Sequence, residues 1–408
     1  MVDNPNGYTV RRMSDRRDKS VLLIALIADR VGLALLYIVF GPVVRQLGID
    51  ELQFGLLIAA ANITLGLASP WWGRRSQAIG RKPVLIAGLT GYAAGFVALG
   101  LALQAGLDGR LAPGALFAWL LAARLLYGLF AAGTQPAATA YIADITAPGL
   151  RARGMALIGV AAGVGTLIGP ALGGLLTGVA TVAPLYAAAG IAAGAALLCA
   201  VALRESHGAA LRKTASRGRL AWTDRRILRC LAGWCVVVLV MTGLQTVIAF
   251  YIADDVLGPD ATAVTRATSL AFLAMGAAMI VTQVGVLQAT HIAPGYLTAV
   301  GFALFGAAAA LLAVAGSMGL VYVGFALMGA GFGAIGPGLN AAGTLAVHAH
   351  ERGAVAGLLA AAPVIGMIVG PLAGATLYGV HHSLPFAAGC AASLAMAAWF
   401  VSGQRRDR

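Results

Sequence analysis

Long apolar stretches constrain the fold of this sequence more than any other feature. Residues 267–350 and 353–404 contain no Asp, Glu, Lys or Arg. A helix needs ~20 apolar residues to cross a bilayer, so twelve such helices would use roughly 240 residues and leave the rest of the 408 for short loops and tails. Because the apolar runs are continuous rather than alternating, they exclude an outer-membrane barrel. We therefore expect an all-α integral membrane protein, held in a lipid bilayer.

Glycine, proline and charged residues divide the sequence into predicted spans. With 55 glycines and only 11% charged residues, these breaks are weak in places, and some boundaries are soft. Twelve spans are predicted, at residues 20–44, 52–72, 83–106, 115–143, 154–177, 182–203, 230–253, 268–290, 296–315, 319–343, 354–379 and 384–403.

The basic residues indicate how the spans are oriented. Of the 28 Lys and Arg, 23 fall in both tails and in alternate loops, whereas only Arg45, Arg110 and Arg266 fall in the intervening loops. By the positive-inside rule, this asymmetry predicts that both termini lie in the cytoplasm, with the chain in a bacterial inner membrane. The net charge of +13 is therefore not taken as evidence of a nucleic-acid partner.

An internal repeat divides the chain into two halves. An offset of 201 residues superposes seven pairs, which are Gly128/Gly329, Pro136/Pro337, Arg151/Arg352, Gly165/Gly366, Gly169/Gly370, Pro170/Pro371 and Gly173/Gly374. The repeat predicts two pseudo-symmetric six-helix halves with a cavity between them, which suits alternating access. The predicted parts are an N-terminal tail (1–19), an N-terminal half (20–203), a basic linker (204–229), a C-terminal half (230–403) and a C-terminal tail (404–408).

The fifth predicted span carries the strongest local motif. Small residues at this spacing allow close helix approach, and proline bends the helix. The pattern GxxxGPxxGG is formed by Gly165, Gly169, Pro170, Gly173 and Gly174. It resembles the antiporter motif of the twelve-helix drug:proton antiporters in the major facilitator superfamily, a group that includes tetracycline-type, multidrug and siderophore exporters.

Further motifs support the same resemblance. Residues 70–85, with Gly73, Gly80, Arg81 and Lys82, resemble the superfamily's cytoplasmic loop signature. Gln77 and Ala78 stand where the family has Asp and Arg, which implies that the cytoplasmic latch is weaker or rebuilt.

The fourth span and the junction after it also resemble this family. Residues 124–128 resemble the RxxxG element of the family, and residues 141–146, with Asp144 and the following Arg151, resemble the fourth-to-fifth helix junction of tetracycline-type antiporters. The resemblance implies the major facilitator fold and a transporter, not an enzyme.

Few charges lie deep in the predicted spans. A charge at the bilayer centre costs ~2.5–3.5 kcal/mol on insertion scales, so Asp29, Arg30 and Arg124 are expected to face a cavity or a partner. A carboxyl group whose distance from a cation changes between conformations changes its proton affinity. We expect Asp29 to bind the transported proton and Arg124 to tune it. The alternative is a permanent structural ion pair of Asp29 with Arg30 or Arg124.

Polar residues in the spans are candidates for a substrate cavity. Successive helical residues point ~100° apart, so Arg30 is expected to point away from Asp29, where it would meet an anionic substrate or reach toward the membrane surface. For each neutral residue taken alone, hydrogen bonding or packing between helices is the favoured interpretation. The candidate cavity residues are Arg30, Tyr37, Asn62, Gln135, Gln245 and Asn340.

The sequence therefore predicts a secondary active exporter of a small organic molecule, such as a drug or a siderophore-like metabolite, driven by proton antiport. No phosphate-binding Gly-x4-Gly-Lys-Ser/Thr loop occurs, and no cofactor or metal site is expected. The alternatives are a proton-coupled importer of a small anion or metabolite, or a transporter-like sensor, which the lack of a signalling domain disfavours. We expect the protein to act as a monomer.

Overall fold

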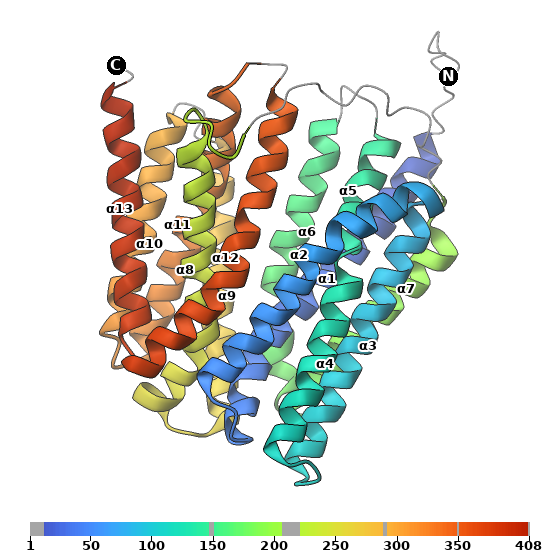
Figure 1. Cartoon of the computed structure of the whole chain (residues 1–408), viewed down its shortest axis with the longest axis vertical. Helices are drawn as coiled ribbons and strands as arrows, with labels where there is room; N and C mark the ends of the chain where they lie inside the picture. Colours follow the sequence, from blue (N-terminus) through green and yellow to red (C-terminus); the bar gives the residue numbers. More distant parts are fainter. Residues whose placement is uncertain (1–11, 147–150, 206–220, 289–291, 349–350, 407–408) are drawn as a thin grey trace.

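The computed structural model describes residues 12–146, 151–205, 221–288, 292–348 and 351–406. In this part of the chain, twelve helices are long and apolar enough to span a bilayer, which confirms the predicted number. The predicted N-terminal tail as far as residue 11 and the linker residues 206–220 lie outside the described ranges. Helices run side by side along the bundle (Figure 1).

The described residues form a series of α-helices with one π-helical turn. They are α1 (Arg12–Gln46), α2 (Glu51–Ile79), α3 (Arg81–Leu107), α4 (Pro113–Ala131), α5 (Thr134–Ile145), α6 (Arg151–Leu176), α7 (Ala183–Ala202), α8 (Leu228–Tyr251), the π-helical turn η3 (Ile252–Leu257), α9 (Ala261–Gln288), α10 (Pro294–Ala313), α11 (Met318–Leu345), α12 (Arg352–Val380) and α13 (Leu384–Arg406).

The fourth span is broken into α4 and α5, which the sequence did not predict. Pro136 has no N–H, and its ring clashes with the carbonyl four residues earlier, at Ala132, where α4 ends. Its repeat equivalent Pro337 lies inside the unbroken α11. The sequences around the two prolines differ, and a proline alone therefore does not decide whether a span breaks.

Three helices extend by seven or more residues beyond a predicted bound. α1 begins at Arg12 rather than at residue 20, α2 continues from residue 72 to Ile79, and α9 begins at Ala261 rather than at residue 268. A membrane helix does not have to end at the first charge, since helical turns beyond the apolar core are solvated. The start of α2 is fixed by a capping box, in which Asp50 Oδ1 accepts from the Gln53 N–H at 2.7 Å.

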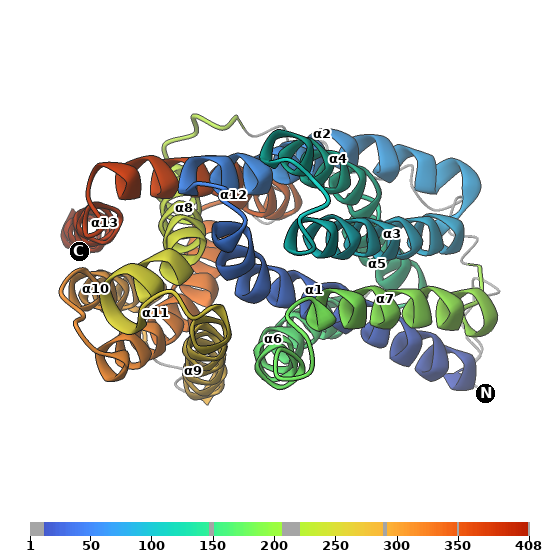
Figure 2. The ribbon, with the colours of Figure 1, turned by 90° about the horizontal axis from the view of Figure 1, so that it is seen from below.

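The chain forms two halves, α1–α7 and α8–α13, which lie beside each other in Figure 2. α1 begins and α13 ends at the same end of the bundle, at the top of Figure 1, which we call the termini end. The opposite end, where α1 ends and α2 begins, is called the far end.

Helix packing repeats between the halves as the 201-residue offset predicts. A Cβ at Gly165 would overlap Arg30 of α1, and a Cβ at Gly366 would lie 2.5 Å from the Leu239 backbone nitrogen of α8. Thus α6 packs on α1 as α12 packs on α8. Gly128 and Gly329 likewise face the backbone carbonyls of Ala61 and Met275.

The halves meet along α2 and α12 and along α6 and α9. Near the far end, a Cβ at Gly55 would lie 2.9 Å from the Pro371 carbonyl oxygen, and one at Gly174 would lie 3.3 Å from the Ser269 Cβ. At mid-span, Asn62 Nδ2 donates to the Met367 carbonyl at 2.7 Å. The Gly55 and Gly174 contacts lie at the far-end part of the bundle, so this conformation is closed at the far end.

Candidate functional site

Asp29 and Arg30 form an ion pair at the middle of α1. Arg30 Nε lies 3.5 Å from Asp29 Oδ2. The expectation that the two side chains diverge is wrong, because the long arginine side chain turns back toward its neighbour. The Arg30 side chain is 32% exposed and the Asp29 side chain 14%, so the pair is not sealed into the core.

Helices α5 and α6 hold Arg30 on its other sides. Gln135 Oε1 accepts from Arg30 Nη2 at 2.9 Å, which connects α1 to the first turn of α5. Gly165 of α6 has no side chain, so the α6 backbone lies directly against the Arg30 Cβ. Two predicted features, the deep charges of α1 and the glycine motif of α6, thus come together at Arg30.

An aromatic cluster supports Asp29 from behind. Tyr92 of α3 donates its hydroxyl hydrogen to the Asp29 backbone carbonyl at 2.9 Å. That hydroxyl occupies the space that a Cβ at Gly32 would need. The Tyr92 ring stacks on Phe96 at 4.7 Å between centroids and meets the Tyr127 ring edge-on at 5.1 Å. Because these rings are buried, the backbone at Asp29 has a fixed position.

Arg124 lies buried in α4, with 1% of its surface exposed. Its Nε donates to the Leu57 carbonyl at 3.3 Å, and its guanidinium lies 4.9 Å from the Tyr127 ring centroid. Nη1 has no hydrogen-bond partner among the described residues. Within those ranges Arg124 makes no ion pair with Asp29. Tyr127, which the guanidinium contacts, packs on Tyr92, and Tyr92 bonds the Asp29 backbone.

The other candidate cavity residues are dispersed. Tyr37 packs beside the main hydrophobic core. Gln245 of α8 donates to the Met275 sulfur at 3.9 Å, and Asn340 of α11 accepts from Trp234 Nε1 at 3.3 Å. Asn62 bonds across the halves, as given above. Of the neutral polar candidates, only Gln135 joins the charged pair of α1.

The loop motif between α2 and α3 forms a charged cluster at the termini end. Arg81 Nε lies 3.3 Å from Asp144 Oδ2 of α5, and Arg81 Nη1 donates to Ser76 Oγ at 2.8 Å. Gly80 has a φ of +98°, which favours glycine. A Cβ at Gly73 would meet nothing within 4 Å, and the side chain of Arg151 lies outside the described residues.

Glu205, which the sequence analysis missed, completes this cluster. Its Oε1 accepts from the backbone N–H groups of Arg81 at 2.7 Å and Lys82 at 3.4 Å, at the start of α3. A carboxylate is stabilised at a helix N-terminus by the helix dipole. The available signal was an acid directly after the sixth span, at the start of a basic segment.

Comparisons with known proteins agree with this architecture. The family model for the Major Facilitator Superfamily matches residues 22–371. Multidrug resistance protein 2 of Bacillus subtilis is 27% identical over 186 residues, 46% of this chain and 44% of that protein. Tetracycline resistance protein, class G, of Vibrio anguillarum is 29% identical over 196 residues, 47% and 46% of the two chains. The chain thus matches less than half the length of these relatives.

A solved structure shows the same fold over most of the chain. The human organic anion transporter MFSD10 (TETRAN) superposes with a TM-score of 0.68 and 21% sequence identity, over 95% of this chain and 99% of that one.

Proposed function

The chain belongs to the major facilitator superfamily, and from this membership we propose that it exports a small organic molecule in exchange for protons. Its resistance-protein relatives support export, and drugs or siderophore-like metabolites are the substrate classes to test first. The proposal places the protein in a bacterial inner membrane, as a monomer with both termini in the cytoplasm.

The observation that carries the proposal is the ion pair of Asp29 and Arg30. Asp29 is the acid deepest in a span, and its partner Arg30 is shared with Gln135 of α5. The α4–α5 break allows α5 to move relative to α4, and such a movement would draw Arg30 with it. The changed distance to Arg30 alters the proton affinity of Asp29, which couples a proton to the conformational change.

Transport by reconstituted protein tests this proposal. Purified protein in proteoliposomes is assayed for counterflow against a compound panel, with and without a pH gradient. Asp29→Asn cannot release a proton, so uphill transport should be lost while counterflow of a neutral substrate remains. The control is Asp108→Asn, at an exposed acid after α3. Accumulation against the gradient by Asp29→Asn would show that the proton binds elsewhere.

A second candidate is proton-coupled import of a small anion, which the partial exposure of Arg30 favours. An anion that binds Arg30 competes with Asp29 for it, so bound anion and bound proton favour each other. That linkage produces symport. The structural relative named as an organic anion transporter adds support.

The direction of proton movement separates the two candidates. A pH dye inside the vesicles reports protons moving against the substrate in antiport and with it in symport. Antiport of the transported compound would exclude the second candidate, and symport would exclude the first.

A further inference from the structure

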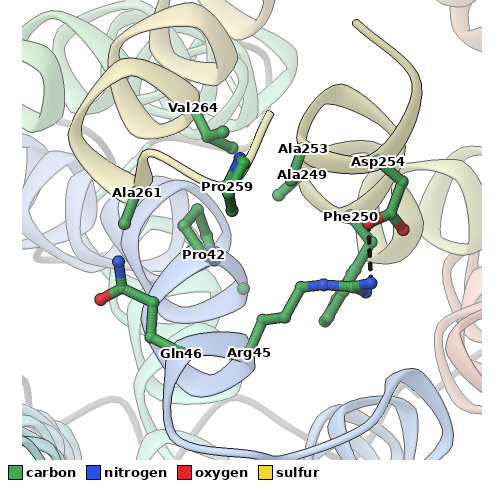
Figure 3. A pocket seen from close by; sticks show the side chains of 11 residues that line it. Pro42, Arg45, Gln46, Ala249, Phe250, Ala253, Asp254, Pro259, Ala261 and Val264 are labelled. Atoms are coloured by element: carbon green, nitrogen blue, oxygen red, sulfur yellow. Dashed lines mark hydrogen bonds and ion pairs between the residues drawn. The ribbon is translucent and has the colours of Figure 1, made fainter. Parts of the chain in front are cut away.

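At the far end, Arg45 connects the two halves. It lies in the last turn of α1 and bonds Glu51 Oε1 of α2, in its own half. Its Nη2 also donates to Asp254 Oδ1 of η3, in the other half, at 2.7 Å (Figure 3). Among the ion pairs between described residues, Arg45–Asp254 is the one that joins the N-terminal half to the C-terminal half.

The C-terminal half holds Asp254 in place for this contact. Tyr378 of α12 donates its hydroxyl hydrogen to Asp254 Oδ2 at 2.8 Å, and the Tyr378 ring stacks on His382 at 4.5 Å between centroids. His382 Nδ1 lies 2.8 Å from Asp255 Oδ2. The two adjacent carboxylates of the π-helical turn therefore point to different sides. Asp254 faces the opposite half, and Asp255 is bonded within its own.

An aromatic layer lies beneath the ion pair and also crosses the halves. The Phe54 ring of α2 lies 5.4 Å from the Phe40 ring of α1 and 5.5 Å from the Phe250 ring of α8. All three side chains are buried. The Arg45 guanidinium lies 5.2 Å from the Phe250 ring centroid, within range of a cation–π contact.

A cavity of about 220 Å³ lies beside the pair, lined by residues of α1, α8, η3, α9 and the loop before α9, which include Gln46 and Pro259 (Figure 3). Both halves contribute to its walls. The far-end interface between the halves thus contains a cavity next to the Arg45–Asp254 pair.

We propose that Arg45 and Asp254 form a far-end gate, which holds the halves together in this conformation and separates when the far end opens. Arg45 suits this role because its guanidinium bonds carboxylates of both halves at once, which a lysine ammonium cannot match in geometry. The inference goes beyond the proposed function, since it depends on neither substrate, proton nor direction of transport.

A distance measurement between the far-end loops tests the gate. Spin labels are attached at Arg110→Cys and Val314→Cys, one exposed site in each half, after replacement of the four native cysteines. Pulsed electron resonance then gives the populations of short and long distances. Asp254→Asn should raise the ratio of long to short about threefold, as expected for a part-exposed ion pair.

Further variants distinguish a gate from a general disturbance. Arg45→Gln should give a shift at least as large, because it also removes the contact with Phe250. The double variant should give no larger shift than Arg45→Gln alone, because Asp254 then has no Arg45 charge left to lose. Arg45→Lys, which keeps the charge and the fold, should give a smaller shift. Asp255→Asn is the matched control on the same turn and should leave the populations unchanged. An unchanged distribution in Asp254→Asn, an equal shift in Asp255→Asn, or additive effects in the double variant would overturn the proposal.

Discussion

Glu205 occupies the space above Gly80 that any larger residue would need. An ideal Cβ at Gly80 would lie 2.5 Å from Glu205 Oε1, the oxygen that accepts the Arg81 N–H. The left-handed φ of +98° at Gly80 aims the first N–H of α3 at this carboxylate. The backbone turn and the first linker residues therefore depend on each other.

Gly80→Ala should destabilise the protein by about 1–3 kcal/mol, since it combines an unfavourable φ with a clash. Thermal unfolding in detergent measures the effect. Gly73→Ala is the matched control, because Gly73 lies inside α2 with open space around it, and alanine is the better helix former. Equal losses in the two variants would contradict the role of Glu205.

Asp144→Asn should lower stability by about 1.5–3 kcal/mol, the contribution of a hydrogen bond to a charged group. The substitution would leave the positive charge of Arg81 without its carboxylate, in a side chain that is only 5% exposed. Ser76 would remain as the other side-chain partner of Arg81. The loss is measured by chemical unfolding of the purified protein. Asp108→Asn removes an exposed pair and should change stability by less than about 0.5 kcal/mol. If Asp144→Asn were as stable as the wild type, the Arg81–Asp144 ion pair would not stabilise the protein.

The spans, the two halves and the packing glycines could be predicted, because apolar length and repeated Gly and Pro are local properties of the sequence. The α4–α5 break was missed because Pro136 and Pro337 are equivalent in the pattern and differ only in their surroundings. Glu205 was missed because its partner is a backbone group 124 residues away. In the sequence, Arg45 is only a charge in a predicted loop. No feature of the neighbouring sequence indicates that Asp254 lies opposite it.

Gly165→Ala and Gly366→Ala should both destabilise the fold, because each glycine faces the neighbouring helix at contact distance. Overpacking of this kind costs about 1–3 kcal/mol. Only Gly165 lies against Arg30, so only Gly165→Ala should also change the pH dependence of transport. Gly159→Ala, with nothing within 4 Å, is the control in the same helix. If the Gly165 and Gly366 variants had equal pH profiles, the glycine motif would have no role in proton coupling.

The acid response of the C-terminal half should depend on Asp224. Hydrogen bonds from the side chain and then the backbone N–H of Arg226 hold the pKa of the Asp224 carboxyl below its usual 3.8. Arg226 also bonds Glu351, and so connects the segment before α8 to the start of α12. Because the folded pKa is the lower one, this stabilisation is present above the unfolded value and is lost as the pH falls through the folded value.

The melting temperature of Asp224→Asn should therefore lie below that of the wild type at neutral pH, and the two should converge only as the pH falls through the lowered pKa of Asp224, below 3.8. Arg226→Gln should behave in the same way, and the double variant should lose no more than Arg226→Gln alone. A difference between wild type and Asp224→Asn that is constant from neutral to acidic pH would show that the carboxylate charge is not its source.

Arg124 offers the sharpest test of coupling, because its guanidinium is buried, lacks an ion pair in the described part of the chain, and contacts the ring cluster behind Asp29. A buried positive charge acts over several ångströms, because the protein interior screens it less than water does. Arg124→Gln should displace the pH optimum of transport upward, because proton binding is easier without the nearby charge. Arg124→Lys keeps the charge but loses the planar contact with Tyr127, so its pH optimum should stay near that of the wild type while its stability falls. If Arg124 only anchors α4 to the Leu57 carbonyl of α2, both variants will lose stability and neither will move the pH optimum, and Asp29 will then titrate without it.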